Sequence, residues 1–141
     1  MGAIDHSYAT LRFFGDDLVP DEISAALGAC PTTSYPKGQE LLGRNTGTVR
    51  IAKTGSWRLC SARREPEDLE SQVFEILDQL SQDMQVWAAI SFRYQSDMFC
   101  GIFMGGTNDG LLLTPSALLA LGQRGISLSL DIYDAGSELG A

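Results

Sequence analysis

Hydrophobic and polar residues alternate most clearly near the C-terminus, within a unit that spans residues 111–134. From Ile126 to Tyr133 every second residue is aliphatic, which is the period of a half-buried strand. Pro115 stands where a helix can begin, and Gly122 and Gly125 follow where that helix must stop. The unit is therefore predicted to form a strand, a short helix and a second strand.

The N-terminal part of the chain repeats this scheme in a weaker form. Residues 8–14 alternate and predict a strand, which Gly15 and two aspartates interrupt. Pro20 opens a predicted helix with one apolar side, and Gly28 ends it. Residues 29–46 form the longest segment of turn-forming residues, and we expect them to be irregular.

The middle of the chain predicts further elements. Residues 48–53 and 56–61 read as two strands of a hairpin that turns at Thr54 and Gly55. Pro66 opens the longest predicted helix, which ends near Asp83 and buries leucine, valine and isoleucine side chains at spacings of three and four. Residues 86–95 alternate and predict a strand, and residues 98–104 predict another before a glycine-rich turn at 105–110.

Together these elements predict an α+β fold. It consists of a largely antiparallel sheet with two or three helices on one face. The order of elements predicts a ferredoxin-like βαββαβ core, followed by a C-terminal βαβ extension. At 141 residues the chain is expected to be a single domain over residues 1–141, with loose termini at 1–6 and 135–141.

Composition narrows the class of protein. The formal net charge of −8 argues against duplex nucleic acid as a partner and is compatible with a basic protein partner. No run of about 20 apolar residues predicts a membrane span, and no secretory signal is evident. The three cysteines show no pairing or zinc spacing, so we expect apolar fillers in a reducing, cytoplasmic compartment.

The alternation also defines a candidate surface on the sheet face away from the helices. Its predicted partner- or ligand-binding residues are Tyr8, Arg12, Arg58, Arg93, Asp131 and Tyr133. Thr10, Ser91 and Ser129 share this face, and Trp87 is expected at its edge. Arginine and aromatic residues are enriched at binding hot spots, and Asp131 is expected to orient the arginines. Three interpretations remain open: a solvated face, the seam of a homodimer, and a binding site.

The sequence offers no catalytic, metal or cofactor motif. The single histidine, His6, lies in the segment expected to be loose, so no base for a nucleophilic triad is predicted. Asp16 and Asp17 are expected to cap the helix that follows them, and Lys37 is expected to be solvated. The glycines at 101–110 lack the spacing of a phosphate-binding loop.

Several short motifs nevertheless resemble one bacterial family, the domain of unknown function DUF4279. They cover most of the chain, from about Tyr8 to Tyr133. The motifs are Phe14-Gly15-Asp16-Asp17, Pro20-Asp21-Glu22-Ile23, Leu27-Gly28 with Pro31, Lys37-Gly38, Trp57 and Leu130-Asp131-Ile132-Tyr133. The resemblance implies no activity and supplies no catalytic residues. Similar small domains include proteins that neutralise toxins, which is an association only.

Three functional hypotheses follow. The first is a non-enzymatic protein-interaction domain, in its most specific form an immunity-type inhibitor of a partner protein. The second is a small-molecule or anion-binding domain, with an enzyme not excluded, that uses Arg12, Arg93, Asp131 and Tyr133. The third is a homo-oligomer whose open sheet faces pair.

Overall fold

The computed structural model describes residues 2–43 and 46–135. Within these residues the chain forms four helices: α1 (Pro20–Leu27), α2 (Leu69–Leu77), α3 (Met84–Arg93) and α4 (Pro115–Gln123). The strands are β1 (Gly2–Ala3), β2 (His6–Gly15), β3 (Thr33–Tyr35), β4 (Glu40–Leu42), β5 (Val49–Ile51), β6 (Gly55–Cys60), β7 (Gln95–Phe103), β8 (Asp109–Gly110) and β9 (Ser127–Tyr133).

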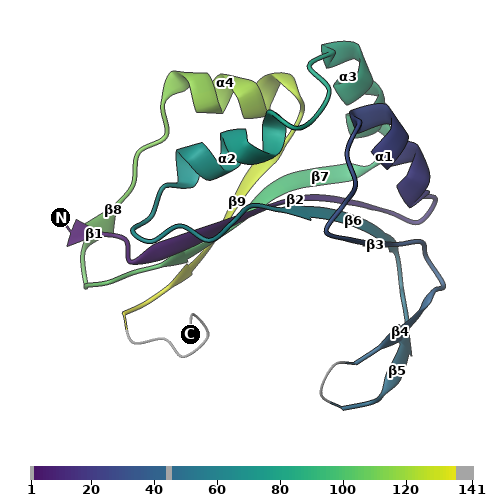
Figure 1. The fold of residues 1–141 in the computed structure, drawn as a ribbon, viewed down its shortest axis with the longest axis horizontal. Helices are drawn as coiled ribbons and strands as arrows, with labels where there is room; N and C mark the ends of the chain where they lie inside the picture. The colour runs from purple at the N-terminus through teal and green to yellow at the C-terminus, as the bar shows by residue number, and fades with distance from the viewer. Residues whose placement is uncertain (1, 44–45, 136–141) are drawn as a thin grey trace.

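Five strands of the described chain form the main sheet, in the order β3-β6-β2-β7-β9. All neighbouring strands are antiparallel except β7 and β9, which are parallel. The helices lie on one face of this sheet and leave the other face uncovered (Figure 1). The predicted α+β fold with a largely antiparallel sheet is confirmed, but the described residues contain four helices instead of two or three.

The core lies between the sheet and the helices. Leu11, Phe13 and Trp57 point to this side and are fully buried. Helix α2 presents the apolar stripe that the sequence predicted, with Leu69, Val73, Ile76 and Leu77 all buried. The helix begins later than expected, because Asp68 caps it by accepting a hydrogen bond from the Ser71 N–H (3.4 Å), and it ends at Leu77 instead of near Asp83.

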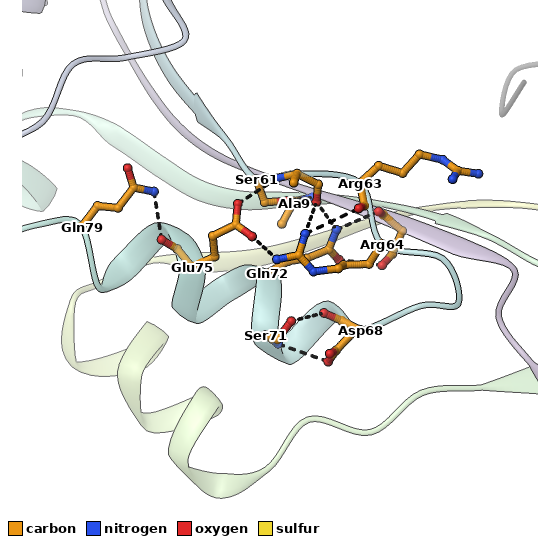
Figure 2. A network of polar contacts seen from close by, with 11 residues as sticks. Ala9, Ser61, Arg63, Arg64, Asp68, Ser71, Gln72, Glu75 and Gln79 are labelled. Atoms are coloured by element: carbon orange, nitrogen blue, oxygen red, sulfur yellow. Dashed lines mark hydrogen bonds and ion pairs between the residues drawn. The ribbon is translucent and has the colours of Figure 1, made fainter.

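A buried polar network also fastens α2 to the sheet (Figure 2). The Gln72 side-chain amide donates to the carbonyl oxygens of Ser7 (2.8 Å) and Ala62 (2.9 Å), and its oxygen accepts from the Ser7 hydroxyl (2.6 Å). Glu75 accepts from the Ala62 N–H (2.8 Å) and forms an ion pair with Arg64. Each buried polar group of Gln72 is thus paired, so this network stabilises the fold.

The prediction of a strand at residues 86–95 is wrong, because α3 occupies most of this segment. Trp87, Ile90 and Tyr94 recur at spacings of three and four and are buried, whereas Phe92 is 91% exposed. Asp83 begins the helix by accepting a hydrogen bond from the Gln85 N–H (2.9 Å). The β-branched and aromatic residues suited a strand, but burial follows the helical period. The ferredoxin-like arrangement is consequently not confirmed.

The predicted hairpin of residues 48–53 and 56–61 is also wrong. β5 pairs with β4, and β6 pairs with β2 and β3. Gly55 serves a close approach instead of a turn, since a Cβ atom there would lie 2.8 Å from the Gly15 carbonyl oxygen. The segment 29–46, expected to be irregular, contributes β3 and β4, and residues 44–45 lie outside the described part of the chain.

The C-terminal unit is confirmed for its helix and its last strand. Helix α4 begins at Pro115 as predicted, but it continues through Gly122, which was expected to stop it, and ends at Gln123. Gly125 takes a φ of +70° in the turn to β9. Residues 111–114 form no strand, however, so the parallel βαβ unit begins earlier, at β7. The predicted alternation of aliphatic and polar residues in β9 is confirmed, but Leu130 and Ile132, on its helix-side face, are exposed.

The N-terminal segment is not loose as expected. β1 pairs with β8, and the side chains of Ile4 and His6 are buried. At the other end, Ala135 is exposed, and the remainder of the predicted tail lies outside the described residues.

Candidate functional site

The uncovered sheet face brings together five of the six predicted site residues. Tyr8 and Arg12 lie on β2, Arg58 on β6, and Asp131 and Tyr133 on β9. The strand register places Arg12 opposite Arg58 on one side and opposite Asp97 of β7 on the other. Their side chains share a face because all lie at even spacings along paired strands.

The best-defined contact on this face is an ion pair between Arg12 and Asp97. The Arg12 Nε donates to Asp97 Oδ1 (2.8 Å), and Nη2 donates to Oδ2 (2.7 Å). The guanidinium also stacks on Phe99, 4.2 Å from the ring centroid, and lies 5.0 Å from that of Phe14. The hydrogen bond to Asp97 raises the pKa of Arg12. The two parallel hydrogen bonds hold the guanidinium in one orientation.

Asp97 therefore performs the role that the sequence analysis assigned to Asp131. Asp131 instead accepts a hydrogen bond from the Tyr133 hydroxyl (2.5 Å), which raises the pKa of that phenol. Asp97 was missed because it falls between the predicted strands at residues 86–95 and 98–104. Only the pairing of β2 with β7 reveals its position opposite Arg12.

Aromatic side chains cover the opposite end of the same face. Phe103 stacks between His6, at a centroid distance of 4.3 Å, and Tyr133, at 4.5 Å, and Tyr8 meets His6 and Phe103 edge-on. The expectation of an exposed, loose His6 is wrong, because the residue lies in β2 and is 6% exposed. Its Nδ1 lies 2.6 Å from an Asp5 carboxylate oxygen, and its Nε2 has no hydrogen-bond partner among the described residues.

Arg58 is the most available cation of the predicted set. Its guanidinium lies 5.4 Å from the Phe14 ring centroid, and its Nε donates to the Ser56 hydroxyl (3.2 Å). No carboxylate among the described residues forms an ion pair with it. Arg58 therefore has charge and hydrogen-bond donors left for a partner.

Arg93, Ser91 and Trp87 do not belong to this face, since all three lie on α3. Arg93 forms long ion pairs with Glu22 (3.4 Å) and Asp17 (3.6 Å). The Ser91 hydroxyl donates to the Arg124 carbonyl oxygen (2.7 Å). Trp87 is fully buried, and its Nε1 donates to the Ser81 carbonyl oxygen (2.7 Å). The false strand assignment explains all three misplacements.

The expected capping role of Asp16 and Asp17 is not found. Val19 precedes α1, and no side chain caps that helix end. Asp16 instead accepts from the Lys37 ammonium group (3.4 Å), so Lys37 is paired, although both side chains remain exposed. A hydrogen bond with Thr54 and the charge of Lys37 lower the pKa of Asp16.

A polar pocket of about 560 Å³ opens where Arg12 and Asp97 reach the end of the sheet. Tyr94, Gln95, Ser96 and Ser127 contribute to its lining. The hydroxyl of Tyr94 is buried and has no hydrogen-bond partner within the described part of the chain. The pocket thus offers a held cation, a carboxylate and several hydroxyl groups to a small ligand.

The β4–β5 hairpin projects from the sheet toward the side of the uncovered face (Figure 1). We call this hairpin the arm. It pairs Glu40–Leu42 with Val49–Ile51, and its apolar side chains Leu42, Val49 and Ile51 are exposed. Exposed aliphatic residues on a projecting hairpin are typical of a contact surface.

No metal site emerges from the described residues, since no three His, Cys, Asp or Glu side chains converge there. Of the described helices, none has the length and apolar character needed to traverse a bilayer. Fold and face define the class: an α+β domain with one helix-covered and one uncovered sheet face.

Comparison with known families identifies the chain further. The sequence model of the domain of unknown function DUF4279 matches residues 5–135. The chain therefore belongs to the DUF4279 family, as its motifs indicated. No curated protein and no solved structure matches the chain.

Proposed function

We propose that this protein is a non-enzymatic protein-interaction domain that binds a partner protein through its uncovered sheet face. The observation that carries the proposal is this face itself. It presents two arginines and several aromatic side chains on a rigid sheet, and the apolar arm borders it. Arginine and tyrosine anchors on a preorganised scaffold are typical of binding hot spots.

The charge distribution supports a basic partner. Residues 66–92 carry six acidic residues and no lysine or arginine, and all six lie on α2 or in the turns before and after it. A net charge of −8 attracts a basic protein over several ångströms and raises its association rate. The sheet face, with its arginines partly balanced by Asp97 and Asp131, then supplies the short-range contacts.

The specific form that we propose is an immunity-type inhibitor in the bacterial cytoplasm. Such a protein needs a tight, specific surface and no catalytic group of its own. The uncovered face fits this requirement, because its held side chains lose little conformational entropy when they bind.

Affinity capture from lysate with a matched pair of charge reversals tests the proposal. Arg58→Glu changes the uncovered face, and Arg93→Glu makes the same change on α3. We expect one protein to be retained by the wild type and by Arg93→Glu, and to be lost with Arg58→Glu. Capture that is equal for both variants, or no capture at all, contradicts the proposal.

The polar pocket favours a second function, the binding of a small polar or anionic ligand. Arg12 lines this pocket and keeps one guanidinium nitrogen that donates to no described residue. A thermal-shift screen with inorganic phosphate, nucleotides and carboxylates tests this function. A ligand at about a hundred times its dissociation constant adds about 2.7 kcal/mol of stability. The absence of any shift over that panel contradicts it.

A further inference from the structure

The two edges of the main sheet differ in how they are protected. The β3 edge has three residues and lies between Pro31 and Pro36, which cannot donate backbone hydrogen bonds. The β9 edge has seven residues, Ser127–Tyr133, contains no lysine or proline, and carries a single charged residue, Asp131. Natural sheets block exposed edges with short strands, prolines and charged residues, so β9 has little of the usual protection against pairing with another strand.

Exposed aliphatic side chains gather beside the β9 edge. Leu130 is 42% exposed and Ile132 is 58% exposed, although both lie on the helix side of the strand. Helix α4, which packs against β9, exposes Leu118 and Leu119. The edge strand and the helix packed against it therefore both carry exposed apolar side chains, which a second chain docked at this edge can cover.

The hydrogen bonds between β9 and β7 determine which backbone N–H and C=O groups of β9 point away from the sheet. The Tyr133 carbonyl oxygen accepts from the Met104 N–H (3.0 Å), so residues of the same parity point their backbone groups toward β7. Because direction alternates along a strand, Leu128, Leu130 and Ile132 direct their N–H and C=O groups outward. Among the described residues, no strand pairs with this row of donors and acceptors at the edge.

We propose that β9 pairs with β9 of a second copy of this chain, antiparallel about a twofold axis through Leu130. Leu130 then faces Leu130 of the partner subunit, and Leu128 faces the partner's Ile132. Three pairs of this kind form about six hydrogen bonds, since each outward pair exchanges two. All three pairs are aliphatic on the helix side, where α4 of each copy closes over them.

The other face of the strand is compatible with this register. Asp131 faces the partner's Ser129, whose hydroxyl is a donor for a carboxylate, and Tyr133 faces the partner's Ser127. No two like charges stand directly opposite each other. A second copy thus provides aliphatic partners on the helix side of β9 and polar partners on its other side. This is the self-complementarity that a twofold interface requires. The two sheets then form one continuous ten-stranded sheet.

Sedimentation equilibrium over a range of protein concentrations provides the first test. We expect a mass twice that of the 15.2 kDa chain at high concentration. Leu130→Lys places two like charges at the axis and is expected to raise the dissociation constant at least about tenfold. Leu42→Lys makes the same substitution at a more exposed leucine on the arm and is expected to leave the mass unchanged. A monomer at all concentrations, or a dimer lost only with Leu42→Lys, overturns the proposal.

Cross-linking tests the register, in a background with Cys30 and Cys60 changed to serine. Leu130→Cys brings two thiols together across the axis, where paired Cα atoms lie about 5.5 Å apart, within disulfide reach. Leu128→Cys separates them by roughly 13 Å. We expect a covalent dimer from the first variant alone after mild copper-phenanthroline oxidation. Equal cross-linking of both variants, or of neither, overturns this register.

Discussion

The two faces of the main sheet arise from the same strands, yet their side chains differ in burial and polarity. On β6, Trp57 and Leu59 point toward the helices and are buried, whereas Arg58 and Cys60 point the other way. On β2, Phe13 is buried in the core and its neighbour Arg12 stacks on Phe99 at the surface. One residue along a strand separates a side chain that stabilises the fold from one that is free to bind. The contrast predicts that changes on the covered face affect folding, and changes on the uncovered face affect binding.

The largest effect is expected for Trp57→Ala. This side chain has no exposed surface, and its Nε1 donates to the Ser24 hydroxyl of α1 (3.0 Å). Its removal leaves a cavity and is expected to lower the free energy of unfolding by about 3–5 kcal/mol, measured by urea denaturation. Trp57→Phe keeps most of the volume and is expected to recover much of this loss. A change below about 1 kcal/mol for the alanine variant would place Trp57 outside the core.

Thiol chemistry distinguishes the two faces without any substitution. Cys100 lies on the covered face, where burial raises its pKa from the ordinary 9.0 to about 12, and Cys60 lies exposed on the other face. At pH 8 the thiolate fraction of Cys100 is therefore lower by roughly a thousandfold. An aromatic disulfide reagent is expected to label Cys30 and Cys60 in the native protein, and Cys100 only after denaturation.

The raised pKa of Cys100 also predicts how stability depends on pH. Below pH 9 the thiol is neutral in both states, so its contribution is fully present. Above pH 9 the unfolded chain releases the proton first, and this contribution declines as the pH rises toward the folded pKa of about 12. Rapid labelling of all three cysteines at pH 8 would contradict the assignment of Cys100 to the core.

A smaller effect is expected for Gln72→Ala, which disrupts the polar network on the covered side. The substitution removes the acceptor of the buried Ser7 hydroxyl and one of the hydrogen bonds to each of the Ser7 and Ala62 carbonyl oxygens. We expect a loss of about 1–3 kcal/mol in the free energy of unfolding. Gln79→Ala is the matched control, because Gln79 is exposed and makes a single bond to the Glu75 carbonyl oxygen. Equal losses for both variants would argue against a structural role for the network.

The smallest effect on stability is expected for Arg58→Glu on the uncovered face. Arg58 forms no ion pair among the described residues, so its change should alter the free energy of unfolding by no more than about 0.5 kcal/mol. Thermal denaturation monitored by circular dichroism measures this, beside Arg93→Glu as a control of equal charge. A large loss of stability in Arg58→Glu would show that side chains of the uncovered face also stabilise the fold.

Local patterns predicted several elements correctly because their signals are short-range. β2, α1, α2, α4 and β9 each have an apolar period and at least one proline, glycine or capping residue at an end. Residues 86–95 mislead because Val86, Ile90 and Tyr94 suit either period. Trp87 and Tyr94 are both buried against other elements. Residues seven positions apart share one side of a helix but lie on opposite faces of a strand, so this burial fits a helix.

The residues of the candidate site also divide into those that local patterns predict and those that depend on strand pairing. Tyr8, Arg12, Arg58, Asp131 and Tyr133 could be assigned to one face because alternation within a strand is local. Asp97, Phe99 and Phe103 were missed, since their contacts with Arg12, His6 and Tyr133 depend on which strands become neighbours.

The sequence by itself determined the family, the α+β class and the two-sided character of its main strands, because these follow from motifs and from periods within single elements. Only the tertiary structure decided that β5 pairs with β4, that Asp97 holds Arg12 and that β9 ends the sheet with an unprotected edge. Pairing between distant segments depends on which arrangement buries the most apolar surface at once, and no single stretch of sequence contains that information.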